Sequence, residues 1–395
     1  MRIVHITDCY APRLGGIEVQ VAELARMQLF TGHTPHVVTA TPGHGEPDPE
    51  SPALPPVHRV VAPLPFELPV HPRPGRRLER LFAELQPDVV HAHVGAVSSF
   101  AWSAARCAAR SGLPLVVSVH SMWDAVTRTT YRALAETYAW TRWPIVLAPV
   151  SRAAAARVLQ VCGDRVPVEV VPNGLDLTGW RQAAPRPEPA PTATGAGVHV
   201  VAVGRLAPRK RALPLLRVLR RAARQIGAEA GLRATIVGDG PAEPFMRQYL
   251  SRHRMTDWVE LPGRVDRELL PAVLASADLF LAPAAREAFG LAALEARAAG
   301  VPVVARRDTG VADFVVHGHN GILADDDRGL ADGIVRLAVD RDLRHRIAGN
   351  NRAESPDASS WPAVLGLLEG CYARACCAAE SHRPMRSRDG PGLPR

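Results

Sequence analysis

The chain has 395 residues, a formal net charge of +8, 47% hydrophobic residues and only 5% aromatic residues. This length exceeds what one hydrophobic core usually serves, and it predicts two domains. The sequence lacks the basic stripe with interleaved aromatic residues that nucleic-acid modules carry, so the positive charge favours a nucleotide-like ligand or an anionic membrane surface.

Targeting signals and cysteine spacing indicate where the protein works. The apolar start, Met1 to Ile6, turns polar at Thr7 and is too short for a signal peptide. No apolar run approaches the roughly 20 residues of a membrane span. The six cysteines are irregularly spaced and predict neither a disulfide framework nor a zinc site. We expect a cytoplasmic protein whose charge also suits association with the cytoplasmic face of a membrane.

Short β-branched runs alternate with helical patterns in the first half of the chain. Strands are expected at Ile3–Ile6, Pro35–Thr39, Asp88–His91, Leu115–Val119 and Val168–Val171, and helices at Ile17–Phe30, Arg76–Leu85, Val97–Arg110 and Ser151–Val161, the last capped by Ser151. This alternation predicts a parallel sheet with helices on both faces.

The same alternation restarts after a proline-rich stretch. Strands are expected at Val198–Val203, Ala234–Val237, Val259–Leu261, Leu279–Ala282 and Val303–Ala305, and a last helix at Trp361–Ala379. The fold class is therefore α/β, with two doubly wound, Rossmann-like domains. In such sheets ligands bind beyond the carboxyl ends of the strands, so we expect the site in a cleft between the domains.

The predicted boundaries follow from these patterns. We expect a first domain over residues 1–175, a linker over 176–197, a second domain over 198–355, a C-terminal helix over 356–379 and a disordered basic tail over 380–395. Loops are also expected at Thr41–Pro56 and Pro185–Gly197.

One run, Glu287 to Val304, carries the strongest chemical signal. It places two acids, Glu287 and Glu295, around the start of a buried helix. Eight helical residues would separate them by about 12 Å, more than the ~5–9.5 Å between the carboxylates of a glycosidase. They could instead hold hydroxyl groups at opposite ends of a long ligand, while the amides of Phe289, Gly290 and Leu291 receive an anion. The alternative is a surface helix with two solvated acids.

The flanking sequence resembles a known family. The stretch from Asp278 to Gly321 resembles the donor-site signature of the retaining family 4 glycosyltransferases, which have the GT-B fold. Further similar motifs are Gly15-Gly16-Ile17-Glu18, His120, Val150-Ser151-Arg152, Val171-Pro172-Asn173-Gly174, Gly204-Arg205-Leu206 with Lys210, and Gly238-Asp239-Gly240-Pro241. They keep the family order over nearly the whole chain. The resemblance implies that the last helix crosses back onto the first domain.

The resemblance implies roles for the charged residues. Arg205 and Lys210 follow a buried strand, where two cations would neutralise a departing diphosphate; composition alone allows a solvated basic turn, and Arg209 competes with Lys210. By resemblance Glu287 binds the hydroxyl groups of the donor sugar and Glu295 those of the ribose. Gly15, Gly16 and Gly238 let backbone amides approach the donor, although Gly15-Gly16 alone is more often a plain tight turn.

His120 ends a predicted strand, which would put its imidazole at the mouth of the cleft. A lone histidine is more often structural, but in the family this position contacts the donor sugar or shapes the acceptor side. His91 and His93 repeat the placement and are interpreted as shaping residues. No acidic cluster accompanies these histidines, and we expect no Asp-x-Asp triplet of the kind found in metal-dependent GT-A enzymes, so we predict no metal and no cofactor.

Several residues depart from the family pattern. Ala284 stands where Ser or Thr is frequent, Ala288 and Arg211 where Gly is usual, Thr309 within a frequent Gly pair, and Asp313 in place of a Glu. The segment Trp123–Trp143 mixes tryptophan, tyrosine and arginine, which fits an interfacial face, an acceptor wall or core packing with exposed arginines.

The sequence thus predicts a retaining, metal-independent glycosyltransferase of hexosyltransferase type that uses a UDP- or GDP-sugar, with the catalytic residues His120, Arg205, Lys210 and Glu287. The acceptor, whether glycan, lipid-linked or small molecule, cannot be identified from these motifs. The rival interpretations are a GT-B nucleotide-sugar epimerase, for which no separate acid and base set stands out, and a non-catalytic donor-binding or scaffold protein.

Overall fold

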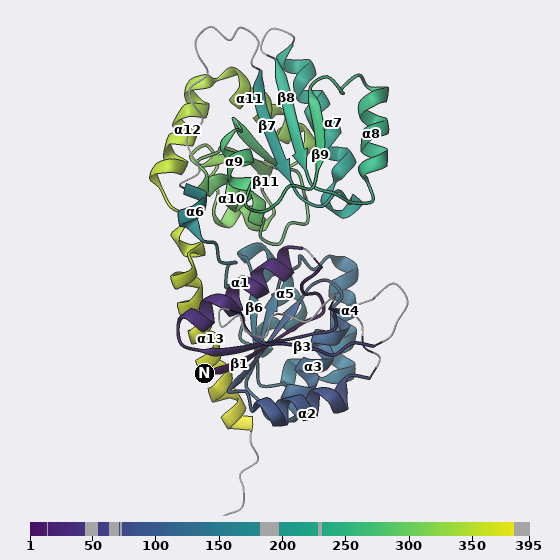
Figure 1. Ribbon diagram of the computed structural model, residues 1–395, viewed down its shortest axis with the longest axis vertical. Helices are drawn as coiled ribbons and strands as arrows, with labels where there is room; N and C mark the ends of the chain where they lie inside the picture. The colour runs from purple at the N-terminus through teal and green to yellow at the C-terminus, as the bar shows by residue number, and fades with distance from the viewer. Residues whose placement is uncertain are drawn as a thin grey trace, which may run out of the picture.

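The protein has two α/β halves stacked along its long axis (Figure 1). This computed structural model describes residues 1–13, 15–43, 54–62, 71, 73–181, 197–227 and 231–382. Each half contains a six-stranded sheet, in the order β3-β2-β1-β4-β5-β6 and β12-β11-β10-β7-β8-β9. The strand pairings in both sheets are parallel, which confirms the two doubly wound, Rossmann-like halves predicted from the sequence.

The first half is built around β4, β5 and β6, whose residues are all buried. Strands covered on both faces are mostly apolar, and the exceptions here are His91 and His93 in β4 and Ser118 in β5. The elements are β1 (Arg2–Thr7), α1 (Gly16–Phe30), β2 (Thr34–Thr39), β3 (Val57–Arg59), α2 (Gly75–Leu85), β4 (Val89–Val94), α3 (Ser99–Arg110), β5 (Leu115–Val119), α4 (Ala125–Tyr138), η2 (Trp140–Arg142), β6 (Ile145–Pro149), α5 (Arg152–Cys162), η3 (Gly163–Arg165) and α6 (Leu177–Arg181).

The second half places β7 and β10 at the centre of its sheet. Its elements are β7 (Val198–Val203), η4 (Pro208–Lys210), α7 (Ala212–Ile226), β8 (Leu232–Val237), α8 (Glu243–Arg252), β9 (Val259–Gly263), α9 (Leu270–Ala275), β10 (Leu279–Ala282), α10 (Leu291–Ala298), β11 (Val303–Arg306), η5 (Gly310–Asp313), β12 (Gly321–Ala324), α11 (Asp327–Val339), α12 (Arg341–Ala353), η6 (Asp357–Ser359) and α13 (Trp361–His382).

One predicted strand is wrong. Val168–Val171 forms only an isolated bridge, between Val168 and Leu147. The segment runs beside β6, and the amide of Val171 donates to the carbonyl of Pro149. Because Pro149 has no N–H to donate in return, the ladder cannot continue. Three short strands, β3, β6 and β12, are absent from the sequence prediction.

The last helix, α13, belongs spatially to the first half. Figure 1 shows it descending from the second half along the edge of the first. Trp361 and Tyr372 are buried in one cluster with Ile3 and Val116. The boundaries predicted from the sequence stay a prediction. Of the linker and the tail, residues 182–196 and 383–395 lie outside the described residues, as do 44–53 of the Thr41–Pro56 loop.

The aromatic segment Trp123–Trp143 packs mainly in the core. Trp123 and Trp140 are buried, and the rings of Trp123 and Tyr131 stack 4.2 Å apart. Tyr138 is exposed, with the guanidinium of Arg106 over its ring. The core-packing alternative therefore describes most of this segment.

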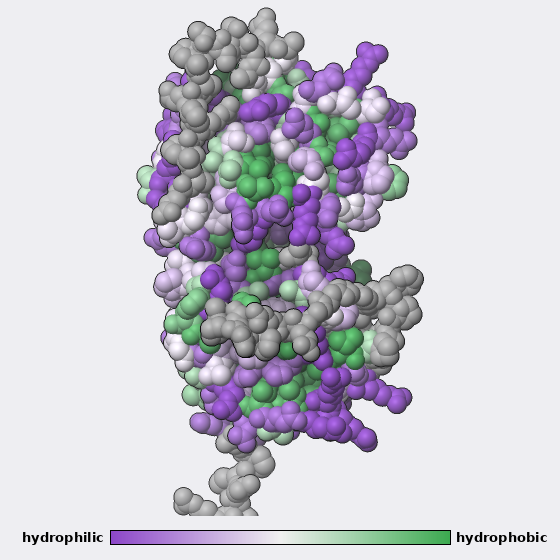
Figure 2. Space-filling view, viewed as in Figure 1, coloured by the Kyte–Doolittle hydropathy of each residue, from purple (hydrophilic) through white to green (hydrophobic). Residues whose placement is uncertain are grey.

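The surface gives no evidence of a membrane span. Of the helices in the described ranges, none is both long and apolar enough to cross a bilayer. On the face shown in Figure 2, hydrophobic residues gather in patches on both halves, bordered by hydrophilic side chains.

All six cysteines are free, as the sequence predicts.

The docking of α13 can be tested at Gly174. A Cβ added there would lie 2.4 Å from Cε3 of Trp361, the first residue of α13. We expect Gly174→Ala to lower the free energy of unfolding by ~1–3 kcal/mol, because the clash displaces a buried ring. Urea denaturation measures the change.

Gly179→Ala is the matched control, since Gly179 lies in α6 and a Cβ there meets nothing within 4 Å. Alanine favours a helix over glycine, so this variant should be as stable as the parent or up to about 1 kcal/mol more stable. Equal stability of both variants would contradict the proposed clash.

Candidate functional site

The loop between β10 and α10 forms the centre of the candidate site. Gly290, the residue before α10, has φ 96°, a left-handed conformation that glycine adopts without a Cβ penalty. A Cβ there would also lie 2.6 Å from Cγ2 of Val311. The turn makes Leu291 the first residue of the helix, so Glu287 lies in the loop before it and the N-terminal amides of α10 face the same region.

An ion pair at this loop joins two of the predicted site residues. Nζ of Lys210 lies 2.6 Å from Oε2 of Glu287, and their side chains are 45% and 20% exposed. The next residue, Arg211, adopts φ 62° and pairs with Asp327 at 2.5 Å. The left-handed backbone at position 211 suits a glycine, the residue that the family resemblance leads us to expect there. Arg211 keeps this backbone and adds an ion pair with Asp327.

Arg205 lies on the neighbouring loop and is exposed. Its loop packs against the glycine loop after β8, because a Cβ on Gly238 would lie 2.0 Å from the carbonyl oxygen of Gly204. Across the two halves, burial and, to a smaller extent, Glu18 raise the pKa of the Cys9 thiol to about 11, and Arg205 opposes the rise. The Arg205 guanidinium therefore acts on the loop after β1.

The glycine pair of the first half faces α10. Gly15 caps α1, which begins at Gly16, and a Cβ on Gly16 would lie 3.7 Å from Cδ1 of Leu291. The start of α1 is therefore next to the start of α10. A Cβ on Gly15 would lie 2.4 Å from Oε2 of Glu18, so a phosphate binding here would have to displace that carboxylate.

Three further contacts hold the halves together around this loop. Asp124, after β5, pairs with Arg286 at 2.8 Å. The hydroxyl of Ser151, which also caps α5, donates to the carbonyl of Ala288 at 2.5 Å. Arg152 pairs with Asp313 at 3.2 Å. The carboxyl ends of β5 and β6 thus meet the loop that carries Glu287.

Glu295 lies within α10 and is buried. Arg267 is 3.4 Å from Glu295 and 2.9 Å from Glu23 of α1, so it bridges the halves. Burial raises the pKa of Glu295 to about 7, against the lowering effect of Arg267. The predicted contact with ribose hydroxyl groups stays a prediction, and it would have to share Glu295 with Arg267.

His120 follows β5 and is half-buried. Its Nε2 lies 3.0 Å from Nδ1 of His93, and its side chain also bonds with that of Asn173. Burial lowers the pKa of His120 to about 4. His91 and His93 are fully buried, so within the described structure they support the sheet behind His120.

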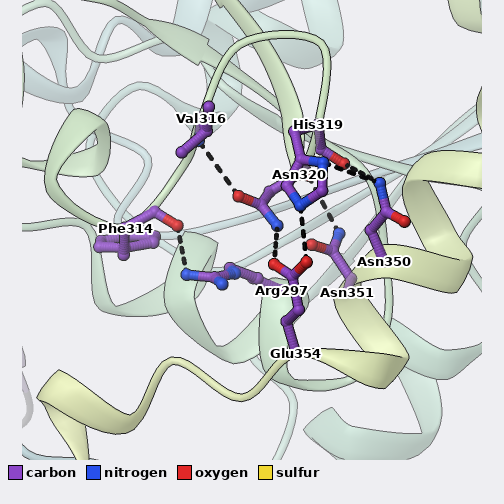
Figure 3. A network of polar contacts seen from close by, with 8 residues as sticks. All are labelled: Arg297, Phe314, Val316, His319, Asn320, Asn350, Asn351 and Glu354. Carbon is purple, nitrogen blue, oxygen red and sulfur yellow. Dashed lines mark hydrogen bonds and ion pairs between the residues drawn. The ribbon is translucent and has the colours of Figure 1, made fainter.

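A polar network braces α10 from behind, as Figure 3 shows. Arg297 donates to the carbonyl of Phe314, whose ring lies 5.4 Å from that of Phe289. Glu354 accepts from His319 at 2.7 Å and from Asn320 at 3.4 Å. The network connects the segment after η5 to the last turn of α10 and to α12.

Two kinds of group could hold a metal ion, and the first corrects the expectation that the chain has no Asp-x-Asp triplet. Two Asp-x-Asp triplets, Asp325 to Asp327 and Asp340 to Asp342, lie at the starts of α11 and α12, where Asp326 and Asp340 accept from backbone amides. The outer acids of the first triplet, Asp325 and Asp327, pair with Arg307 and Arg211. Among the described residues, His5, His91 and His93 bring ring nitrogens within 4.8 Å of one another. These nitrogens already share hydrogen bonds with protein groups.

The ion pairs between the two halves are not predicted from the sequence. Asp124, Arg286 and Arg267 are single charges without a local motif, and their partners lie more than 150 residues away or, for Glu295, 28 residues away. Ser151 carries a capping signal that predicts its first contact. Nothing in the sequence predicts its second contact, with Ala288.

The raised pKa of Glu295 predicts a specific pH dependence. A carboxyl with a higher pKa in the folded state binds a proton more tightly there, so its stabilisation is complete below the unfolded pKa and is lost as the pH rises through about 7. The free energy of unfolding of the parent, compared with that of Glu295→Gln, should fall by up to about 3 kcal/mol between pH 5 and pH 8. Urea titrations at each pH measure this difference, and parallel curves would exclude it.

Two family models match the chain. Residues 14–178 match the one described as "Glycosyltransferase Family 4", and residues 197–340 match the one described as "Glycosyl transferases group 1". The two matches cover the two halves separately.

Similar curated proteins span nearly the whole chain. It is 29% identical to a GDP-mannose-dependent alpha-(1-6)-phosphatidylinositol monomannoside mannosyltransferase of Mycobacterium tuberculosis, over 86% of this chain and 90% of that protein. It is 28% identical to D-inositol 3-phosphate glycosyltransferase 2 of Catenulispora acidiphila, over 98% and 96%.

Solved structures share the fold. HepE of Anabaena, in complex with UDP and glucose, superposes with a TM-score of 0.73 at 20% identity, over 94% of this chain and 99% of that one. Sucrose-phosphate synthase of Thermosynechococcus elongatus gives a TM-score of 0.74 at 20% identity, over 95% and 99%.

Proposed function

Because this chain belongs to the family 4 glycosyltransferases and has their GT-B fold, we propose that it transfers a sugar from a nucleotide-diphospho-sugar to an acceptor hydroxyl. We propose further that the anomeric configuration is retained and that no metal ion takes part. We favour this function over the epimerase and scaffold alternatives, because the family models and the similar curated proteins are glycosyltransferases.

The Lys210–Glu287 ion pair is the observation that carries the proposal. It places a cation and a carboxylate 2.6 Å apart beside the start of α10, with Arg205 on the adjacent loop. A diphosphate next to a sugar needs these groups: cations and helix-start amides for the anion, and a carboxylate for the sugar hydroxyl groups. On donor binding, Lys210 would turn from Glu287 towards the phosphates.

The proposed reaction breaks the bond between the anomeric carbon and the β-phosphate oxygen and forms one from that carbon to the acceptor oxygen on the same face. The acceptor proton passes to the departing phosphate. Negative charge grows on the leaving group, so Arg205 and Lys210 stabilise the transition state more than the ground state. His120 completes the proposed set from the first half, where it would contact the donor sugar or the acceptor.

The donor is proposed to be a UDP- or GDP-sugar. HepE was solved with UDP, and the mycobacterial relative is named for its use of GDP-mannose. Thermal stabilisation by each nucleoside diphosphate and each sugar nucleotide distinguishes the base and the sugar together. We also propose a cytoplasmic location, supported by the six free cysteines, with a charge of +8 that favours an anionic membrane face.

The cations give the first functional prediction. Arg205→Ala and Lys210→Ala should each lower kcat/KM. The loss should correspond to ~2–4 kcal/mol of transition-state stabilisation, because each variant lacks one of the cations that stabilise the leaving diphosphate. Initial rates with the donor identified by thermal stabilisation measure the loss.

Arg209→Ala is the matched control, since Arg209 neighbours Lys210 but acts on the carboxylate of Asp124. It should keep most of the activity. The proposal fails if both cation variants turn over like the parent, or if only the Arg209 variant is impaired.

Metal independence gives a second functional prediction. Arg205 and Lys210 supply the positive charge that a metal ion would otherwise supply, and the outer acids of the triplet Asp325 to Asp327 already pair with arginines. Activity should therefore survive chelation with EDTA, measured as product formed at constant ionic strength. Loss of activity that magnesium or manganese restores would exclude this part of the proposal.

A further inference from the structure

Behind His120 lies a continuous chain of hydrogen bonds that is buried beyond His93. His120 Nε2 is 3.0 Å from His93 Nδ1, His93 Nε2 is 3.0 Å from His5 Nδ1, and His5 Nε2 is 2.6 Å from Oε1 of Gln28. The chain starts at the carboxyl end of β5, crosses β4 and β1, and ends on α1. Burial lowers the pKa values of His5 and His120 to about 4 and that of His93 well below its usual range, so the rings are neutral at pH 7.

Gln28 connects this chain to α13. Its Nε2 donates to the hydroxyl of Tyr372 at 2.8 Å, and that hydroxyl lies 2.9 Å from Nδ1 of His91. The other nitrogen of His91 lies 2.8 Å from Oγ of Ser118. Burial also lowers the pKa of His91 well below its usual range. Four neutral histidines therefore share one network.

A neutral imidazole donates at one nitrogen and accepts at the other, so each ring fixes the next. Since Gln28 Oε1 can only accept, His5 carries its hydrogen on Nε2 and accepts at Nδ1. His93 must then donate from Nε2, which leaves its Nδ1 to accept from Nε2 of His120. All three rings carry hydrogen on Nε2.

The branch through Tyr372 follows the same rule. Its hydroxyl accepts from Gln28 and must donate to Nδ1 of His91, so His91 also carries hydrogen on Nε2 and donates to Ser118. The reverse arrangement is equally complete: if the Gln28 amide turns over, all four rings carry hydrogen on Nδ1. The network thus has two settings, and the amide of Gln28 selects between them.

We infer that Gln28 and Tyr372 are positioning residues that hold His120 with hydrogen on Nε2 and an unprotonated Nδ1. Nδ1 is the nitrogen that does not face His93, so it is the one left for the side chain of Asn173, which lines a cavity of about 20 Å³ together with His120. In this setting the Asn173 amide donates to Nδ1, and a hydroxyl group that takes its place must also donate, because an unprotonated Nδ1 can only accept. This inference rests on the proposed place of His120 in the reaction and specifies its hydrogen-bonding role there.

The tautomers can be observed directly in the full-length protein. Long-range ¹H–¹⁵N correlation spectra of ¹⁵N-histidine-labelled protein at pH 7 distinguish hydrogen on Nδ1 from hydrogen on Nε2. We expect the Nε2 form for His5, His91, His93 and His120, each assigned by single substitution. Mixed tautomers among the four rings, or a charged ring, would overturn the inference.

Gln28→Met tests whether the setting passes from ring to ring. The variant leaves Nε2 of His5 without a partner, and a buried orphan acceptor costs less than a buried orphan N–H. His5 should move its hydrogen to Nδ1, and His93 and His120 should follow, while His91 stays unchanged. Gln20→Met, a buried glutamine of the same helix that donates to the carbonyl of Gly174, should change none of the four.

Tyr372→Phe tests the connection to α13. Without the hydroxyl, the Gln28 amide should turn its N–H towards His5, giving the same three-ring change. Tyr249→Phe is the matched control, because its buried hydroxyl has no partner among the described residues. A shift confined to His5 in either network variant would overturn the coupling.

Activity then separates this inference from the proposed function. The two network variants should lose roughly tenfold in kcat, about the value of one net hydrogen bond, with the donor KM unchanged. Unchanged turnover with His120 in the Nδ1 form would overturn its accepting role, while transferase activity itself would stand. The spectra should be the same with and without EDTA, and a difference would instead indicate a metal held by His5, His91 and His93.

Discussion

The docking of one loop, Glu287 to Gly290, against the carboxyl ends of β5 and β6 is the constraint on which the site depends. Its backbone is held from both sides: Ala288 accepts from Ser151 of the first half, and Glu287 accepts from the amide of Gly310 of the second. Because a left-handed glycine ends the loop, α10 starts at the junction of the halves. The same few residues therefore fix the acid, the helix-start amides and the relative position of the sheets.

The sequence predicts the fold well because its strands are buried on both faces. The strands β5, β7 and β10 have the predicted bounds, since each is a short apolar run between polar turns. Prediction fails where pairing is decided by one missing N–H, as at Val168–Val171, or where a strand is as short as β3. The site motifs can be predicted because each is a short local stretch of sequence. The Arg267 bridge and the histidine network cannot be predicted, because their partners meet only after both sheets have formed.

Departures from the family pattern become intelligible at two positions. Arg211 keeps the left-handed backbone that suits a glycine, and its guanidinium gains Asp327 as a partner. Asp313 accepts from both the amide and the side chain of Arg152, so the shorter acid serves the junction between the halves. In both cases the side chain gains an ionic partner near the Lys210–Glu287 pair.

The position of α13 affects the order in which the chain can fold during synthesis. The first sheet is complete in sequence by residue 149, yet one of its faces is covered by Trp361 and Tyr372. Synthesis proceeds from the N-terminus at about 5–20 residues per second, so this face stays uncovered while the entire second half is made. The emerging first half must keep this apolar surface from aggregating over that interval. The cluster on this face is completed only when α13 has left the ribosome, whereas the larger core of the first half contains no residue of α13.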